Sequence, residues 1–367
     1  MGLGVCTDED IQDFIGEGVI KSDRGIKNAG EMTQIQPSSL DLRCGFGKKV
    51  WHLPYSSTPV KNLREFLDST ATHSFDLTEK RFLHKGSVYV LELEESLNLP
   101  SGISAKSSSK STTGRIDIHA RLLTEDGRDF DNIAENYNGK LFLEVVSNSM
   151  DLYFYPGDSL NQIRFFRGPK TEVDQKTLES LLELEGIIKN FDVEPIHLED
   201  CVIDNFLLLT LSLDENDPGY KLREDAPALD LSSEKNSLPL SKYFERVNLV
   251  DGNLILNPHS FYLLKSREVV SIPRDYCAEM VDISTELGEY RAHYAGFFDP
   301  GFKETAVMEI RNTSDVPILL REGQRISSLK FFGLTREPEK IYGKKLDSNY
   351  DGQRGKVKAA KFFDMDK

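Results

Sequence analysis

Paired cysteines, tryptophan and long apolar runs are all scarce in this chain. The four cysteines lie far apart without a C-x-x-C pair, so we expect reduced, buried thiols and no disulfide framework. No run approaches the roughly 18 apolar residues of a membrane-spanning helix, and the first residues lack the basic start and apolar core of a signal peptide. The missing apolar runs and signal sequence predict a cytoplasmic protein that does not enter a membrane. For the single tryptophan, Trp51, we expect a packing role.

An excess of basic residues is also missing. The formal net charge is −15 and the Lys and Arg residues are scattered, which argues against a protein that binds nucleic acid along its phosphates. A small phosphorylated ligand is compatible with this charge, because two or three cations in one pocket can bind it. The sequence His197-Leu198-Glu199 matches half of the zinc-dependent nucleobase deaminase signature, but the P-C-x-x-C half is absent, so we expect no zinc site.

Residues 110–115, with the sequence K-S-T-T-G-R, form the most informative stretch of the chain. Small hydroxyl side chains let the backbone approach a ligand closely, Gly114 relaxes the turn, and Lys110 and Arg115 can contact phosphate oxygens. The stretch therefore predicts an anion-binding turn. A polar turn between two strands explains the same residues, and only the rest of the chain distinguishes the two interpretations.

Apolar periodicity predicts a mainly β protein with a few short helices. Thr7 is an N-cap candidate for a short amphipathic helix over residues 7–18, and alternating strand patterns then continue to Gly168. A second helical pattern covers residues 177–189 and is interpreted as joining two domains. We divide the chain, whose length suits about two domains, into an N-terminal domain, a helical linker and a C-terminal domain: residues 1–172, 173–195 and 196–367.

The second half of the chain repeats the first half in order. Residues 82–91 are echoed by residues 255–264, and residues 141–166 are echoed by residues 306–332. Each pair offers the same strand and turn signals in the same sequence. Two copies of one β-domain are the economical explanation.

Six short motifs, taken in order, resemble the dCTP deaminase branch of the trimeric dUTPase-like superfamily in a double-length form. They include an apolar-Asp-apolar strand at residues 39–43, a turn at residues 110–115 that is similar to R-S-S-x-x-R, and an A-x-x-x-D-P-G hairpin at residues 295–302. Strands that end in Glu144 and Glu309 and a P-G-x-x-I-x-Q-like turn follow. The tail completes the resemblance with Tyr342, Tyr350, Gln353 and Gly355.

This resemblance covers most of both halves and implies two tandem dUTPase-like domains, each a distorted, jelly-roll-like β-barrel. The halves depart from the family pattern in complementary ways. The N-terminal half keeps the turn but has Ala134 where the family's Asp would fall, while the C-terminal half keeps Asp299 but has an acidic stretch at residues 281–290 in place of the turn. Since turn and hairpin come from neighbouring subunits in the family's trimers, the resemblance implies a composite site in a homo-oligomer.

The resemblance makes Glu309 the first candidate for the catalytic carboxylate and Glu144 the second. A strand glutamate paired with a cross-strand cation is the structural alternative for both. Ser111 and Arg115 would orient the attacking water and the glutamate, without zinc. The nucleotide, carried with Mg²⁺, would be bound by Lys110, Thr112, Gly114, Ala295, Asp299, Tyr342, Tyr350 and Gln353.

The implied reaction is hydrolytic deamination of dCTP to dUTP and ammonia, in pyrimidine deoxynucleotide metabolism. Water attacks C4 while one partly buried carboxylate carries the protons, since burial brings the pKa of a carboxyl toward the working pH. A dUTP diphosphatase, or a bifunctional enzyme that yields dUMP, is the second hypothesis. A nucleotide-binding scaffold without catalysis is the third, because Lys110, Thr112 and Asn349 replace the family's usual Arg, Ser and Lys.

Overall fold

The computed structural model describes residues 2–28, 33–56, 59–190, 201–282, 290–292, 296–343 and 357–363. Over these residues the predicted mainly β fold with few helices is confirmed. The chain divides into two compact units. The N unit comprises Met1–Lys170, Pro227–Glu234 and Leu334–Lys340, and the C unit comprises Thr171–Ala226, Lys235–Gly333 and Ile341–Lys367. Two short segments that the sequence analysis placed in the C-terminal domain therefore belong with the first unit.

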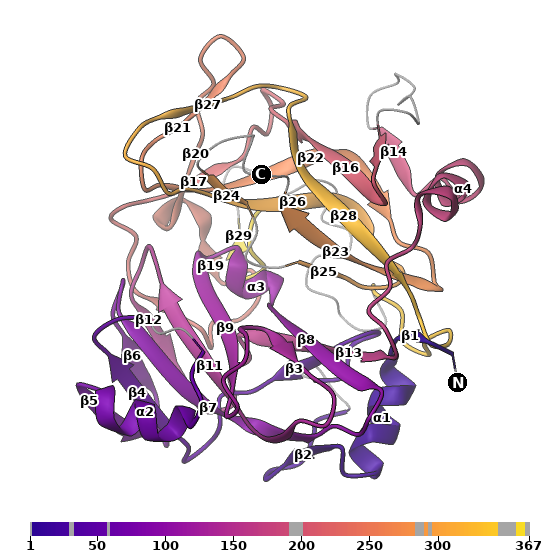
Figure 1. The fold of residues 1–367 in the computed structure, drawn as a ribbon. Coiled ribbons are helices and arrows are strands. Elements are labelled where there is room, and N and C mark those ends of the chain that lie inside the picture. Colours follow the sequence, from indigo (N-terminus) through magenta and orange to yellow (C-terminus); the bar gives the residue numbers. More distant parts are fainter. Residues whose placement is uncertain are drawn as a thin grey trace. The chain divides into compact units, whose positions relative to one another are not determined.

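Three sheets make up the N unit (Figure 1). Their strands are β1 (Gly4–Val5), β2 (Ile20–Ser22), β3 (Leu40–Leu42), β4 (Lys49–Leu53), β5 (His73–Asp76), β6 (Arg81–Leu83), β7 (Val88–Asn98), β8 (Ile103–Ser109), β9 (Ile118–Thr124), β10 (Asn132–Ile133), β11 (Asn138–Ser147), β12 (Leu152–Phe154), β13 (Asn161–Arg167) and β18 (Leu229–Asp230). One sheet has the order β1-β13-β8-β10 with β3 on β13. The others have the orders β5-β4-β7-β11-β9, with β2 on β7, and β18-β12-β6.

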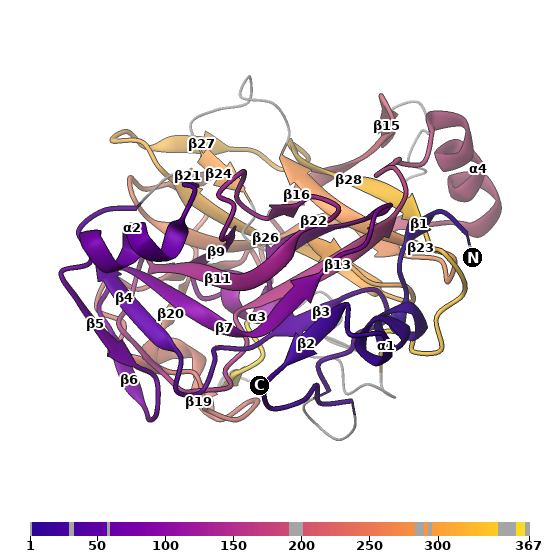
Figure 2. The same cartoon turned by 60° about the horizontal axis from the view of Figure 1, so that its bottom comes forward.

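Short helices accompany these sheets: α1 (Asp8–Gly16), α2 (Leu63–Thr70) and α3 (Ser111–Gly114). The predicted N-cap is confirmed, because Thr7 precedes α1 and donates its N–H to the carboxylate of Asp10 at 3.0 Å. Figure 2 shows α2 beside β4, where Leu63 and Leu67 share a buried cluster with Trp51. The predicted packing role of the tryptophan is therefore confirmed.

The C unit is built around one large sheet. Its elements are α4 (Gln175–Glu185), β14 (Ile188–Asn190), β15 (Val202–Ile203), β16 (Phe206–Ser212), β17 (Tyr220–Leu222), β19 (Leu238–Pro239), η1 (Leu240–Lys242), β20 (Phe244–Arg246), β21 (Leu254–Leu256), β22 (Phe261–Ser271), β23 (Tyr276–Asp282), β24 (Tyr290–Ala292), β25 (Phe297–Phe298), β26 (Lys303–Asn312), β27 (Ile318–Leu320), β28 (Arg325–Gly333) and β29 (Phe362–Phe363). The main path of the sheet is β20-β17-β22-β16-β28-β23-β25, with β26 on β22 and β24 on β26. Two pairs, β19-β29 and β21-β27, lie outside it.

Helix α4 is shorter than the pattern over residues 177–189 predicts. It ends at Glu185 because Gly186 takes the left-handed conformation, at φ 60°, and the following residues form β14, which pairs with β22. Three of its four leucines, Leu178, Leu181 and Leu182, are buried in the core of the C unit, whereas Leu184 is exposed. The described part of the segment interpreted as a linker, residues 173–190, thus belongs to the C unit.

The strand registers of the two units coincide, which confirms the predicted repeat. Glu144 lies opposite Val90 in the β11-β7 pair, and Glu309 lies opposite Leu263 in the β26-β22 pair. The β13-β8 and β28-β23 pairs correspond in the same way. The first elements of each unit also correspond. Helix α1 is followed by β2, which pairs with β7, and helix α4 is followed by β14, which pairs with β22.

One buried glutamate occupies the same place in both units. Glu95 in β7 and Glu268 in β22 each lie where the pairing register shifts. Glu95 accepts the backbone N–H of Arg43 at 2.8 Å, and Glu268 accepts that of Thr210 at 2.9 Å. Burial raises the pKa of both carboxyls. Because both units keep this arrangement, it serves the fold.

The cysteine prediction is also confirmed by the described residues. All four cysteines are reduced and buried: Cys6, Cys44, Cys201 and Cys277. Burial raises the pKa of Cys6 to about 12, so this thiol is protonated at neutral pH.

Candidate functional site

The predicted anion-binding turn forms a single helical turn, α3, at the end of β8. The backbone N–H of Gly114 donates to the carbonyl of Lys110 at 2.9 Å, and that of Arg115 donates to Ser111 at 3.1 Å. Ser111 and Thr112 are half-buried, whereas Arg115 is buried. The structure therefore brings together five predicted site residues, which we call the cradle: Lys110, Ser111, Thr112, Gly114 and Arg115.

Lys110 forms an ion pair with Asp41, which lies in β3. The Lys110 side chain is 20% exposed and the Asp41 side chain 10%, so the pair lies at the edge of the buried interior. Asp41 belongs to the apolar-Asp-apolar strand motif, but its contact with the cradle could not be derived from two motifs 69 positions apart. This pairing is the first feature of the site that the sequence did not indicate.

Asp117 anchors the far end of the cradle. This fully buried residue takes the left-handed conformation, at φ 59°, and its N–H donates to the carbonyl of Gly114 at 2.9 Å. Its carboxylate accepts the hydroxyl of Ser149, and its carbonyl accepts the backbone N–H of Asn148 at 3.1 Å. Asp117 thereby fixes α3 to the turn that follows β11. An Asp next to a Gly-containing turn was the only sequence signal for it.

Glu144, the second candidate carboxylate, is engaged within the N unit. It lies directly opposite Arg121 in the β11-β9 pair, and its Oε1 lies 2.6 Å from Nη2 of Arg121. Ser56 donates its hydroxyl to the same oxygen at 2.9 Å. Glu144 therefore forms the cross-strand pair with a cation that the sequence analysis gave as the alternative to a catalytic role.

The hairpin positions of the two units can be aligned by register. Ile133 lies opposite Ala105 in β8, and Phe298 lies opposite Ala278 in the corresponding strand β23. The next residues, Ala134 and Asp299, are therefore equivalent, as the motif alignment predicted.

The N unit has its own carboxylate three residues before Ala134. Asp131, at φ 61°, accepts the N–H of Leu122 at 2.8 Å and the hydroxyl of Ser107, and burial raises its pKa. Sequence reasoning missed Asp131, because the family motif places the hairpin carboxylate at the position of Ala134.

The C unit holds the remaining predicted residues that the structure describes. Glu309 is buried, at 2% exposure, in the middle of β26. Asp299 begins the D-P-G turn, where Tyr342 donates its N–H to the carbonyl of Pro300 at 3.0 Å. The ring of Tyr342 contacts that of Phe302, with centroids 5.5 Å apart. The structure thus brings the start of the predicted closing tail to the hairpin turn.

Three predicted site residues, Ala295, Tyr350 and Gln353, lie outside the described residues, as do His197 of the rejected zinc motif and Gly355. The described part of the chain holds no group of three or more His, Cys, Asp or Glu side chains placed to bind a metal ion. Within the same ranges no helix combines the length and the apolar character needed to cross a membrane.

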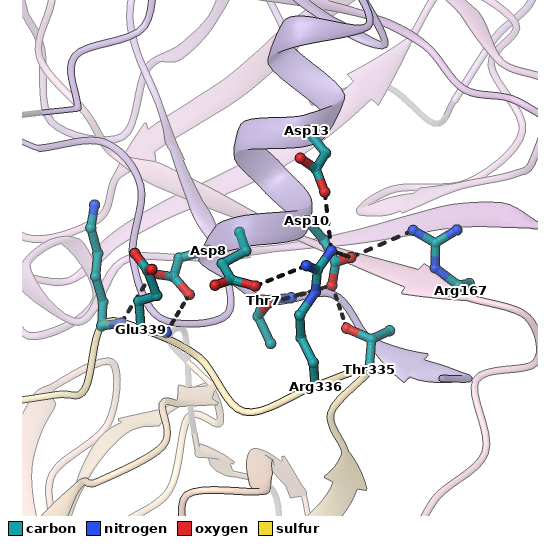
Figure 3. Close-up of polar contacts among 10 residues, drawn as sticks. Thr7, Asp8, Asp10, Asp13, Arg167, Thr335, Arg336 and Glu339 are labelled. Atoms are coloured by element: carbon teal, nitrogen blue, oxygen red, sulfur yellow. Dashed lines mark hydrogen bonds and ion pairs between the residues drawn. The ribbon is translucent and has the colours of Figure 1, made fainter. Parts of the chain in front are cut away.

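The segment that precedes the tail is held by charge within the N unit (Figure 3). Arg336 places Nη2 2.5 Å from one carboxylate oxygen of Asp10, and Thr335 donates its hydroxyl to the other. Arg167 approaches the same carboxylate from a different side, with its Nη2 3.6 Å from Oδ1 (Figure 3). We call Asp10 with these three residues the Asp10 clamp.

Asp8 adds a backbone anchor beside the Asp10 clamp. Its carboxylate accepts the N–H groups of Glu339 and Lys340 at 3.1 and 3.0 Å (Figure 3). The tail that begins two residues later therefore starts from a fixed point.

Two β-domains with matching registers define a double-length β protein, in which one domain carries a cationic, hydroxyl-rich turn and the other a D-P-G hairpin and a buried glutamate. Two family models match the chain: the 2′-deoxycytidine 5′-triphosphate deaminase (DCD) N-terminal domain at residues 2–169 and the DCD C-terminal domain at residues 181–363. The crystal structure of 2′-deoxycytidine 5′-triphosphate deaminase from Agrobacterium tumefaciens is similar over 92% of this chain and 100% of that chain, with a TM-score of 0.82 and 31% identity. The chain belongs to the dCTP deaminase family.

Curated relatives match a shorter stretch. A protein of Leifsonia xyli subsp. xyli named "dCTP deaminase, dUMP-forming" is 36% identical over 129 residues, which are 34% of this chain and 63% of that protein. A protein of the same name from Streptomyces coelicolor is 36% identical over 118 residues, 31% of this chain and 62% of that protein. The chain thus spans somewhat less than two thirds of the length of these relatives.

Proposed function

We propose that this protein deaminates dCTP hydrolytically, with water and dCTP giving dUTP and ammonia. The proposal is supported most by one observation, the division of polar residues between two units of identical register. The N unit has the cradle but Ala134 at the hairpin position, and the C unit has Asp299 and Glu309 but an acidic sequence at the turn position. We infer that one active site draws on residues from both kinds of unit, in a homo-oligomer.

Glu309 is the proposed proton carrier. A buried strand carboxylate can take a proton from water as it attacks C4 and deliver protons to N3 and to the leaving ammonia. Glu144 remains the second candidate, and Arg121 and Ser56 both bind its Oε1 within the N unit. Ser111 and Arg115 orient the water and the glutamate in this proposal, which needs no zinc.

The nucleotide is proposed to bind through three groups of residues. Lys110 and the cradle hydroxyls, with Thr112 and Gly114, contact the triphosphate, which carries its own Mg²⁺. Asp299 contacts the sugar, and the backbone at Ala295 reads the base. Tyr342, Tyr350 and Gln353 belong to a tail that closes over the triphosphate.

Turnover of dCTP with Mg²⁺ tests the activity directly. Release of ammonia together with a deaminated nucleotide is expected. Tight binding of dCTP without ammonia would support the alternative of a nucleotide-binding scaffold instead.

Mixing two inactive variants tests the shared site. Arg115→Ala damages the cradle in the N unit, and Glu309→Gln removes the carboxylate in the C unit. If the site forms between chains, co-refolded mixtures recover a fraction of wild-type activity, because some sites receive two intact halves. Mixtures as inactive as either variant alone would contradict a site shared between chains.

A second candidate is a dUMP-forming reaction, which the names of the curated relatives favour. Deamination alone releases no pyrophosphate, whereas dUMP formation from dCTP releases one pyrophosphate for each ammonia. Measuring both products in one time course distinguishes the two candidates, and pyrophosphate released at the rate of ammonia would replace dUTP by dUMP as the product.

A further inference from the structure

The repeat provides an internal control that separates residues of the fold from residues of the ligand site. Any polar arrangement that the β-domain needs in order to fold is expected in both units, as the matched pair Glu95 and Glu268 shows. A polar arrangement present in one unit and replaced by apolar residues in the other is dispensable for the fold. Its retention then points to the ligand.

The ion pair between Lys110 and Asp41 is an arrangement of the second kind. Asp41 lies opposite Gln162 in the β3-β13 pair, and the corresponding position in the β16-β28 pair is Leu208, opposite Ser328. Leu208 is 9% exposed, so an apolar side chain fills this place in the C unit. The C unit also lacks the lysine. Ser109 corresponds to Asp282 by register, so Lys110, the next residue, corresponds to Ile283 in the sequence.

The position of Asp41 is itself well supported. Its backbone N–H donates to the carbonyl of Gln34 at 2.8 Å. The loop that carries Gln34 is held by Lys340, whose ammonium donates to the carbonyl of Ile35 at 3.0 Å, and by the N–H of Asp8, which donates to Pro37 at 3.1 Å. A carboxylate on such a braced strand gives the flexible lysine one defined orientation.

We propose that Asp41 is a positioning residue, which holds the ammonium of Lys110 in place for a phosphate group of the nucleotide. The inference rests on the proposed function. A free lysine loses side-chain entropy when it binds an anion, and an ion pair formed beforehand removes much of that cost. Asp41 therefore strengthens nucleotide binding through Lys110, although the carboxylate of Asp41 and the phosphate are both negatively charged.

A double-mutant cycle tests this role. Asp41→Asn keeps the shape of the side chain and removes its charge, and it should raise the Kd and KM for dCTP with Mg²⁺ about tenfold while kcat changes little. Lys110→Ala should raise both constants at least as much. In the Lys110→Ala background, Asp41→Asn should have no further effect, because its action passes through the lysine.

Controls keep the test decisive. The C unit shows that this fold accepts leucine at the equivalent position, so Asp41→Leu should fold and should bind as weakly as Asp41→Asn, while Asp41→Glu should recover part of the affinity. Glu95→Gln, which alters the acceptor of the Arg43 N–H two residues after Asp41, should lower the stability without changing KM. An additive effect of Asp41→Asn and Lys110→Ala, or tighter binding by Asp41→Asn, would overturn the proposal, since Asp41 would then act independently or compete with the phosphate.

Equilibrium binding separates this inference from the proposed function. If the wild-type protein binds dCTP and releases no ammonia, the deaminase proposal fails, and the cycle can still be measured from Kd alone. If the wild-type protein turns over dCTP and the cycle shows no coupling, only the role of Asp41 fails.

Discussion

The N unit and the C unit share their strand registers and differ at the polar positions proposed for chemistry. Glu95 and Glu268 make the same backbone contact in both units. Asp41 of the N unit corresponds to Leu208, and Asp299 of the C unit corresponds to Ala134. Polar residues kept in both units, such as Glu95 and Glu268, maintain the fold, and we propose that Asp41 and Asp299, each replaced by an apolar residue in the other unit, serve the ligand.

The largest predicted effect contrasts the two strand glutamates. Glu309→Gln should lower kcat by about 10²–10⁴-fold, because the proposed proton carrier is lost while the shape is kept. Glu144→Gln should leave kcat within a factor of about three, because its role is to pair with Arg121. Steady-state deamination kinetics of the two variants decide the matter, and a greater loss in Glu144→Gln would make the N unit the catalytic one.

The next effect concerns the Asp10 clamp, which distinguishes the first helices of the two units. Asp10 is the third residue after the N-cap Thr7, and the third residue after the N-cap Asp174 of α4 is Thr177. Asp10→Asn should lower the free energy of unfolding of the N unit by about 3–5 kcal/mol, since Arg336 and Arg167 lose their buried counter-charge. Trp51 lies in the N unit and is the chain's single tryptophan, so denaturant unfolding followed by its fluorescence measures this unit.

The pH dependence of this effect has a defined sign. Burial alone would raise the pKa of Asp10, but the hydrogen bonds from Arg336 and Thr335 hold it below the ordinary 3.8. A lowered pKa stabilises the fold above pH 3.8, and that stability is lost as the pH falls through the folded-state value. The difference between wild type and Asp10→Asn should therefore shrink in acid. Glu9→Gln, which removes a half-exposed partner of Arg336, is the matched control and should cost only about 0.2–1 kcal/mol.

The smallest effect tests the shared glutamates. Glu268→Gln should lower the stability of the C unit by about 1 kcal/mol, because its buried carboxyl accepts a backbone N–H. Glu95→Gln should lower the stability of the N unit with the same sign and by more, because Glu95 also pairs with Arg43 at 3.0 Å. Each folded-state pKa lies above the ordinary 4.5, so the wild-type glutamate stabilises its unit most below pH 4.5 and loses this advantage over Gln as the pH rises. Amide hydrogen exchange of β7 and β22 across this pH range measures the two units side by side. Opposite pH trends would break the equivalence of the units.

Local patterns predicted much of the fold and part of the site. The N-cap Thr7, the strand alternation and the repeated turn signals are short-range features, and each led to the right element. The equivalence of Ala134 and Asp299 also followed from sequence order alone. The cradle was found because its cations, hydroxyls and glycine are consecutive.

Features that depend on distant residues were not predictable. The contact of Lys110 with Asp41 joins the residue after β8 to β3, and only the sheet order, in which both strands pair with β13, brings them together. The hydrogen bond between Arg336 and Asp10 spans 326 positions, and nothing local marks either residue as its partner. The end of α4 was misplaced for a different reason, because apolar Ile187 and Ile188 continue the helical pattern after Gly186 has turned the backbone into β14.

The composition of the N unit has a consequence for biosynthesis. Its last segment, Leu334–Lys340, carries the arginine and the backbone N–H groups that α1 binds, and most of the C unit is translated before it. At about 5–20 residues per second, a ribosome needs on the order of ten seconds or more between the two parts. The acidic start of α1 therefore lacks Arg336 and the backbone N–H groups of Glu339 and Lys340 for most of translation, and the N unit, which is begun first, is completed only after most of the C unit has been made.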